Sequence, residues 1–127
     1  MSVLVDSSVW IDFFRNTGRA DELEFLIEEN IVVINDLILA ELIPPLNVRK
    51  QNKLISLLRE INRQVTAIDW NEIIKFQTVC LKNGINGVGI PDLIIVQNAL
   101  QGRLKLMTND KHFLLLSRYL DFEIYDQ

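Results

Sequence analysis

Four carboxylates attract attention in this sequence because of where they lie along the chain. Asp6 directly follows the apolar run VLV, and Asp110 follows KLMTN. Asp92 opens the apolar segment PDLIIVQNALQG. Glu41 lies within LILAELI, where an ionised side chain needs either a cation or a hydrogen-bond network. If these carboxylates converge they repel one another, so they stay ionised only when a cation is supplied.

The chemistry of such a cluster favours a hard divalent ion. Mg²⁺ and Mn²⁺ prefer carboxylate and water oxygens, and one or two such ions can activate water and neutralise a phosphodiester under attack. Cys80 is the only cysteine and His112 the only histidine, so one chain contains neither a disulfide nor a zinc site of Cys and His ligands. Any metal here must therefore be held by oxygen.

Helix capping offers a simpler explanation for two of these residues. Asp is a leading N-cap residue, and Asp6 and Asp110 each precede a helical pattern, SVWIDFFR and KHFLLLSRYL. Capping or a place on a helix surface also suffices for Asp12 and Asp36. It does not explain Asp92, because a buried anion without a partner is costly in free energy.

Short β-branched runs alternate with longer helical patterns, which is typical of βαβ units and a mostly parallel sheet. The expected strands are Val3–Val5, Ile31–Ile34, Val65–Ile68, Lys105–Met107 and Phe122–Tyr125. Junctions between strands and helices in an open parallel sheet gather at the carboxyl ends of the strands, where ligands bind. Three of the four carboxylates lie at such junctions, so all four could converge on one pocket.

The segment PDLIIVQNALQG predicts a helix that is buried on more than one face. Pro91 occupies a favoured first-turn position, and Gly102 is a natural C-terminal cap. Pro44 and Pro45 are expected to end the helix that contains Glu41. The glycine-rich stretch NGINGVG predicts a turn.

The chain has the size of a single domain, taken as residues 1–127, with a formal charge of −4. That charge disfavours non-specific binding to nucleic acid, so an RNA substrate needs a local basic rim. The candidates for this rim are Arg15, Arg49, Lys50, Lys53, Arg103, Lys105 and Lys111. Apolar residues form 49% of the chain, which favours a homodimer or a dedicated partner, although a monomer with a large core stays open.

The longest apolar region, IVVINDLILAELIPPL, is interrupted by Asn35, Asp36 and Glu41. We therefore expect a soluble, cytoplasmic protein that does not associate with membranes.

Four segments together resemble the PIN-domain family, and especially the VapC toxins of bacterial toxin–antitoxin pairs. They are VLVDSSVWIDFFR, the isolated Glu41, IPDLIIVQNAL and KLMTNDKHF, in the order and approximate spacing of that family over nearly the whole chain. The resemblance implies a three-layer α/β/α sandwich around a twisted, mostly parallel sheet of about five strands.

The resemblance also implies the function of individual residues. Asp6, Glu41, Asp92 and Asp110 match the family's acidic metal-site residues, and Ser8 and Thr108 match polar positions that support the site. The implied activity is metal-dependent cleavage of RNA with Mg²⁺ or Mn²⁺. For the toxins of this family we further expect a small antitoxin whose basic segment enters the acidic pocket.

Two other functions are consistent with parts of the sequence. A receiver-like phosphoacceptor domain also has about five strands and an acidic pocket that binds Mg²⁺, but it needs adjacent acids after the first strand, and VLVDSS offers one. Asp69 could be the acceptor, yet no lysine matches the one that follows the fifth strand. A PIN-like domain that binds RNA or a partner without cleaving is the second alternative, which a metal-dependent cleavage assay distinguishes.

Overall fold

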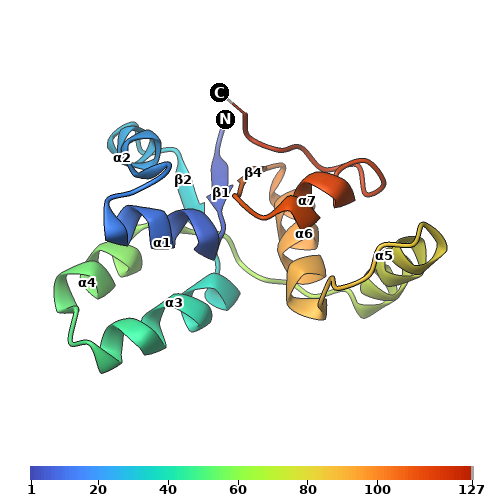
Figure 1. Cartoon of the computed structure of the whole chain (residues 1–127), viewed down its shortest axis with the longest axis horizontal. Helices are drawn as coiled ribbons and strands as arrows, with labels where there is room; N and C mark the ends of the chain where they lie inside the picture. Colours follow the sequence, from blue (N-terminus) through green and yellow to red (C-terminus); the bar gives the residue numbers. More distant parts are fainter. Residues whose placement is uncertain (127) are drawn as a thin grey trace.

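A parallel sheet lies at the centre of the protein in a computed structural model that describes residues 1–126. Its strands are β1 (Val3–Val5), β2 (Val32–Ile34), β3 (Asn62–Arg63) and β4 (Lys105–Met107), in the order β3-β2-β1-β4 (Figure 1). Every neighbouring pair is parallel, with Leu4 opposite both Val33 and Leu106. The predicted α/β architecture with a parallel sheet is confirmed.

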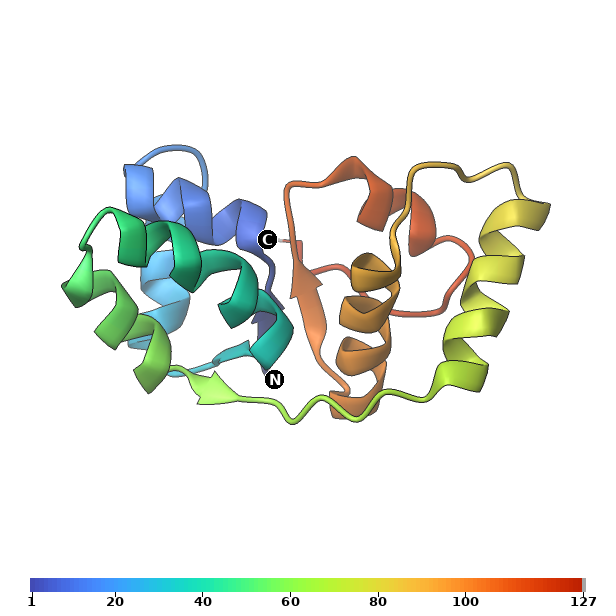
Figure 2. The ribbon, with the colours of Figure 1, turned by 90° about the horizontal axis from the view of Figure 1, so that it is seen from below.

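The strand order explains why helices cover both faces of this sheet. The helices are α1 (Ser7–Arg15), α2 (Ala20–Glu28), α3 (Asp36–Val48), α4 (Asn52–Glu60), α5 (Trp70–Lys82), α6 (Ile90–Gly102) and α7 (Lys111–Leu116). The chain runs from β1 to β2 to β3 in one direction and then returns past β1 to β4. Because crossovers between parallel strands are right-handed, α1–α4 and α5–α6 must cover opposite faces. Figures 1 and 2 show this three-layer arrangement.

The most buried helix is α6, as its sequence predicts. Seven consecutive residues, 93 to 99, are buried, and Pro91 lies in the first turn. The turn-rich stretch NGINGVG forms the connection between α5 and α6. Gly102 is the last helical residue, whereas the left-handed cap is Arg103, with φ of 52°. A Cβ at position 102 would lie 2.8 Å from the side-chain Cδ of Gln64, so this flexible side chain would have to move if the glycine were replaced.

The predicted strand at Val65–Ile68 is wrong, because side chains of α6 donate hydrogen bonds to backbone carbonyls that a neighbouring strand would otherwise need. Asn98 Nδ2 donates to the carbonyl of Val65 at 3.0 Å, and Gln101 Nε2 donates to that of Ala67 at 2.8 Å. Gln97 exchanges hydrogen bonds with both backbone groups of Asp69, at 3.1 and 3.0 Å. The strand forms earlier, at Asn62–Arg63, where the chain pairs with β2.

The predicted strand at Phe122–Tyr125 is reduced to a single parallel bridge between Ile124 and Leu106. The backbone N–H of Leu106 donates to the carbonyl of Glu123 at 2.9 Å, and the N–H of Tyr125 donates to the carbonyl of Leu106 at 2.8 Å. The segment therefore lies beside β4 at the edge of the sheet, but only Ile124 pairs with it.

The prediction that Pro44 and Pro45 end their helix is also wrong, since α3 continues to Val48. A proline fixes φ near the helical value but donates no hydrogen bond, so two carbonyls one turn earlier lose their usual donors. Burial of Leu42, Ile43 and Leu46 compensates for that loss, because these residues pack α3 into the core. Glu41 is thereby held on a continuous helix.

Within residues 1–126, no helix combines the length and the apolar character that crossing a membrane requires.

Candidate metal-binding site

The carboxyl ends of β1 and β4 form the point at which the strand order reverses. In open α/β sheets such a switch point is where ligands bind. β1 ends at Val5 and is followed by Asp6, whereas β4 ends at Met107 and is followed by Thr108. Both residues are buried, at 4% and 5% exposure, although both are polar.

Asp6 is the centre of the hydrogen-bond network at this switch point. Its Oδ1 accepts from the backbone N–H of Ser8 at 3.1 Å, which makes Asp6 the N-cap of α1, and from Ser8 Oγ at 2.5 Å. Its Oδ2 accepts from Thr108 Oγ1 at 2.6 Å. Burial raises the pKa of Asp6, while the hydrogen bonds from Ser8 and Thr108 lower it. Helix capping therefore accounts for the hydrogen bonds of Oδ1. The second oxygen, Oδ2, is held by Thr108, the residue that follows β4.

The two predicted supporting residues, Ser8 and Thr108, connect Asp6 to the loop after β4. Thr108 Oγ1 accepts from the backbone N–H of Asp110 at 2.9 Å, and Ser8 Oγ accepts from that of Asn109 at 3.0 Å. Both hydroxyls also donate to Asp6, so each one links strand β1 to the segment that carries Asp110.

Asp110 and Asp92 lie at the beginnings of two neighbouring helices. Asp110 is the N-cap of α7, and its Oδ1 accepts from the backbone N–H of His112 at 2.9 Å and lies 3.0 Å from Nδ1 of the same residue. Asp92 is in the first turn of α6. Burial raises the pKa of Asp92, a backbone hydrogen bond from Gly89 lowers it, and the charge of Asp110 raises it further.

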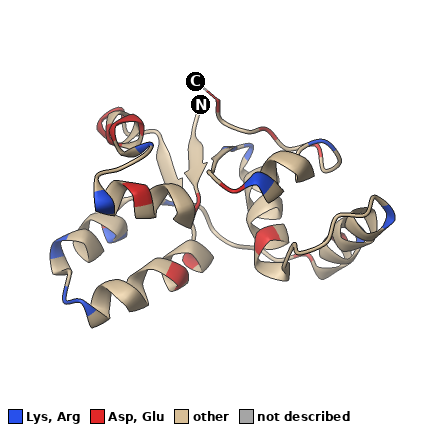
Figure 3. Cartoon of the chain, viewed as in Figure 1, with Lys and Arg blue, Asp and Glu red and all other residues tan. Residues whose placement is uncertain are grey.

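Glu41 joins the cluster from α3, with an exposed side chain. Neighbouring protein atoms still remove part of its hydration, which raises its pKa, and the charges of Asp92 and Asp6 raise it further. All four predicted carboxylates are therefore coupled by charge around the switch point. Figure 3 shows acidic positions on α3, on α6 and at the end of β1 near the middle of the molecule.

No lysine or arginine neutralises this cluster in the described part of the chain. The ion pairs there join Arg19 to Glu22, Arg63 to Asp36 and Lys105 to Glu123, with His112 beside Asp110. The donors thus fit a hard divalent ion in their chemistry. No three His, Cys, Asp or Glu side chains within residues 1–126 are arranged to hold an ion together, so a single shared ion stays a prediction.

Glu41 also faces a groove of about 310 Å³ between α1, α3 and α4. Its lining includes the charged residues Arg15 and Arg49 and the apolar residues Ile11, Phe14 and Leu46. Two of the predicted basic rim residues therefore lie in one groove with a site carboxylate. Lys105, by contrast, lies 3.8 Å from a carboxylate oxygen of Glu123.

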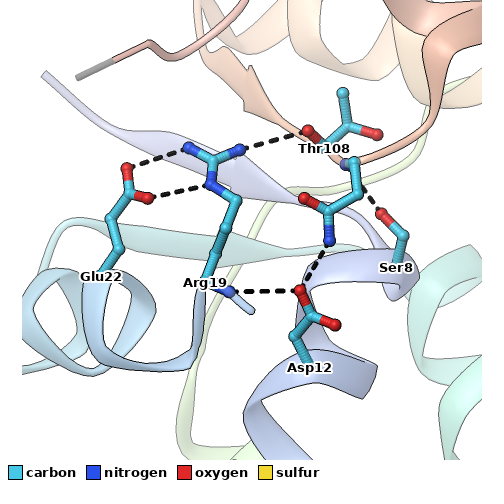
Figure 4. Close-up of polar contacts among 6 residues, drawn as sticks. Ser8, Asp12, Arg19, Glu22 and Thr108 are labelled. Atoms are coloured by element: carbon cyan, nitrogen blue, oxygen red, sulfur yellow. Dashed lines mark hydrogen bonds and ion pairs between the residues drawn. The ribbon is translucent and has the colours of Figure 1, made fainter. Parts of the chain in front are cut away.

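Sequence reasoning missed the hydrogen bonds of Asp12. It predicts a capping or surface role, whereas Asp12 Oδ2 accepts from Asn109 Nδ2 at 2.8 Å and from the backbone N–H of Arg19 at 3.2 Å (Figure 4). It also missed Asn35, a fully buried residue after β2 whose Nδ2 donates to Asn98 Oδ1 at 3.0 Å. Asn35 follows a strand just as Asp6 does, and that position was the available signal.

The raised pKa values predict how stability depends on pH. A carboxyl group with a higher pKa in the folded state binds protons more tightly when folded, so its contribution to stability falls as pH rises above about 4. We expect metal-free Glu41→Gln protein to match the wild type at acidic pH. At neutral pH it should be more stable by at most about 1 kcal/mol, because Glu41 is exposed and solvent screens its charge.

Thermal unfolding from pH 4 to 8, with Glu24→Gln on the exposed face of α2 as the matched control, measures this effect. Lower stability of Glu41→Gln at neutral pH would contradict the repulsion that the cluster implies. Adding Mn²⁺ should reverse the order, because the wild type gains more from the ion.

A family model for the PIN domain matches residues 3–118. The chain belongs to the PIN-domain family. Comparison with curated protein sequences finds no significant match.

The fold of this PIN domain is similar to three solved structures. A VapBC2 structure from Rickettsia felis, bound to a DNA fragment from their promoter, has a chain with a TM-score of 0.77 and 20% identity, over 100% of this chain and 99% of that one. FitAcB from Neisseria gonorrhoeae gives 0.73 and 18%, covering 98% and 96%. VapBC-1 from nontypeable Haemophilus influenzae gives 0.71 and 23%, covering 99% and 98%.

Proposed function

We propose that this PIN-domain protein is a metal-dependent endoribonuclease and the toxin of a toxin–antitoxin module. The observation that supports the nuclease most directly is a charge-coupled set of carboxylates, from β1, α3, α6 and the β4–α7 loop, at the switch point of the sheet. Three of them have no cationic partner among the described residues. Their mutual repulsion is a cost that a bound divalent ion would offset.

Asp6, Glu41, Asp92 and Asp110 would hold Mg²⁺ or Mn²⁺ in this proposal. The ion would supply charge neutralisation at the phosphodiester and a more acidic bound water. Ser8 and Thr108 fix the direction of both Asp6 oxygens through the hydrogen bonds described above. Mg²⁺ keeps several waters, so fewer than four direct carboxylate bonds would suffice.

Arg15 and Arg49 are the proposed contacts for the RNA backbone. Both are exposed and line the groove that Glu41 also faces, so a phosphate bound there would lie beside Glu41. Arginine suits this task because its planar guanidinium donates two parallel hydrogen bonds to phosphate oxygens. This local pair would counter the repulsion of RNA by a chain with a formal charge of −4.

Removal of the metal tests the proposed reaction. We expect RNA cleavage with Mg²⁺ or Mn²⁺ and none in excess chelator, with products that carry 5′-phosphate and 3′-hydroxyl ends, because water attacks phosphorus. End-labelled RNA and product analysis measure both. Cyclic 2′,3′-phosphate products or undiminished cleavage in chelator would show a different mechanism, and failure to cleave any RNA would favour the non-catalytic alternative.

The receiver-like alternative is disfavoured by the surroundings of Asp69. This residue is the N-cap of α5 and accepts from the backbone N–H of Glu72 at 3.3 Å, and it does not follow a strand. Phosphorylation by a small phosphodonor is expected to fail.

The toxin assignment adds a small antitoxin with a basic segment as partner. The resemblance to VapC toxins supports it, as does the groove beside Glu41, which combines apolar and charged walls. We also propose a homodimer. Trp70, Ile74 and Leu81 are 57%, 63% and 64% exposed at a spacing that aligns them on one face of α5, a surface suited to self-association.

A further inference from the structure

Three side chains hold the loop between β4 and α7 against the beginning of the chain, and the site described above does not account for them. They are Asp12 on α1, Arg19 at the start of α2 and Asn109 within the loop. Figure 4 shows the guanidinium of Arg19 between Glu22 and Thr108, and the backbone nitrogen of Arg19 beside Asp12. We propose that these three residues form a brace that positions Asp110 for metal binding, an inference that rests on the proposed function.

The first half of the brace fixes Asn109. Its side-chain Nδ2 donates to Asp12 Oδ2 at 2.8 Å, and its backbone N–H donates to Ser8 Oγ at 3.0 Å. Two turns of one helix thus hold the side chain and the backbone of the same residue. The residue that follows is Asp110.

The second half of the brace fixes Thr108. Arg19 Nη1 donates to the carbonyl of Thr108 at 3.2 Å, and its Nε and Nη2 each donate to a carboxylate oxygen of Glu22 at 2.9 Å. The paired hydrogen bonds to Glu22 hold the guanidinium in one plane, which directs its remaining donor towards the loop. Hydrogen bonding to Glu22 correspondingly raises the pKa of Arg19.

Asp12 joins the two halves. Its Oδ2 accepts from Asn109 and also from the backbone N–H of Arg19, at 3.2 Å. Gly18 makes this approach feasible, because a Cβ at that position would lie 2.2 Å from Asp12 Oδ2, and its φ of +51° favours glycine. Both donors therefore bind the same oxygen of Asp12, which joins the loop after β4 to the start of α2.

The brace acts on Asp110 through the residues before it, because the backbone N–H of Asp110 donates to Oγ1 of Thr108, the residue whose carbonyl accepts from Arg19. Asp110 caps α7, a helix of six residues, and its carboxyl group must approach Asp92 on a different helix. A metal site needs ligands held close to their bound positions before the ion arrives. Asp12, Arg19 and Asn109 are therefore positioning residues in this proposal.

Two substitutions at Asp12 separate positioning from direct metal binding. Asn retains an oxygen that can accept both hydrogen bonds but removes the charge, whereas Ala removes the acceptor. We expect Asp12→Ala to weaken Mn²⁺ binding about tenfold or more, the range for residues that orient metal ligands, and Asp12→Asn to stay within about threefold of the wild type. Asn109→Ala should weaken binding in the same direction, and the double variant should be no weaker than Asp12→Ala, since the contact between Asp12 and Asn109 is lost in all three.

Electron paramagnetic resonance of free Mn²⁺ measures the affinity, and Asp21→Ala, an exposed carboxylate of α2, is the control for loss of one negative charge. Hydrogen exchange at the backbone amides of Asn109 and Asp110 in metal-free protein measures loop order independently. Exchange should be faster in Asp12→Ala than in the wild type and unchanged in Asp21→Ala.

Each result then has a defined meaning. Unchanged exchange in Asp12→Ala would overturn the brace, and so would an Asp12→Asn variant that binds Mn²⁺ as poorly as Asp12→Ala. A wild-type protein that binds no Mn²⁺ and cuts no RNA would instead overturn the proposed function, while the exchange measurement would still decide whether the brace exists.

Discussion

Replacing Asp92 with Asn is expected to abolish RNA cleavage while the fold stays intact. The carboxyl group of Asp92 interacts by charge with both Glu41 and Asp110, and it is one of the ligands of the proposed ion. Loss of one charged ligand costs several kcal/mol of transition-state stabilisation, and about 3 kcal/mol corresponds to at least about a hundredfold in rate.

The stability of Asp92→Asn should change by less than about 1 kcal/mol, because two effects oppose each other. Removing the charge relieves repulsion from Asp110, but it also removes a favourable interaction with the N-terminus of α6. Asp36→Asn is a matched control, since Asp36 also lies in the first turn of a helix but has a side chain that is 71% exposed and pairs with Arg63.

Cleavage rates at saturating Mn²⁺, with thermal unfolding of both variants, measure these effects. An Asp92→Asn protein that retains most of its activity would remove Asp92 from the metal site. An equal loss in Asp36→Asn would show that the change in net charge, and not the lost ligand, is responsible.

Asp6→Asn is a less clean test of the same idea. Asp6 accepts three hydrogen bonds, two from Ser8 and one from Thr108, and an amide offers one oxygen in place of two. One of the hydroxyl partners would have to reverse its hydrogen bond, and Thr108 Oγ1 already accepts from Asp110. A loss of activity in Asp6→Asn would therefore combine metal binding with loop order.

Strands whose sequence pattern is local were predicted well. The bounds of β1 and β4 match VLV and KLM, and β2 begins one residue later than IVVI suggests. The segment Val65–Ile68 has the same β-branched character, yet its carbonyls bind side chains of Asn98 and Gln101. Those partners lie more than 30 residues away, so no local pattern could reveal that competition.

In the candidate site, too, the sequence could place some residues together but not others. Asp6 and Thr108 could be placed together from the sequence, because parallel strands direct their carboxyl ends to one edge. The contact between Asp12 and Asn109 depends on the exact rotation of α1 beneath the loop after β4, and the partners are 97 positions apart in the sequence. Gly18 was the one sequence feature at this contact, but glycine alone does not identify the carboxylate that it accommodates.

A small antitoxin is expected to reduce cleavage at least about a hundredfold when it is co-expressed and purified with this protein. The carboxylates of Asp6, Glu41 and Asp92 lack cationic partners among the described residues, and an arginine or lysine of the partner could satisfy them as a metal ion would. The groove beside Glu41 offers apolar side chains for an amphipathic segment that flanks this charge.

Two matched substitutions test whether the groove is the binding surface. Ile11 lines the groove and is 38% exposed, whereas Phe25 on α2 is 55% exposed and lies outside it. Ile11→Glu should weaken the complex about tenfold or more, because it places a carboxylate among apolar contacts, while Phe25→Glu should leave it unchanged.

The decisive comparison uses the antitoxin with and without its basic segment, titrated against cleavage of one labelled RNA. The full-length partner should inhibit, and the truncated partner should still bind the groove but restore most of the cleavage, because it no longer competes for the carboxylates. If no small protein encoded beside this one forms a complex with it, or if the complex cleaves as fast as the free enzyme, the toxin assignment fails. The nuclease assignment would survive that result, since it depends on the carboxylates and not on what covers them.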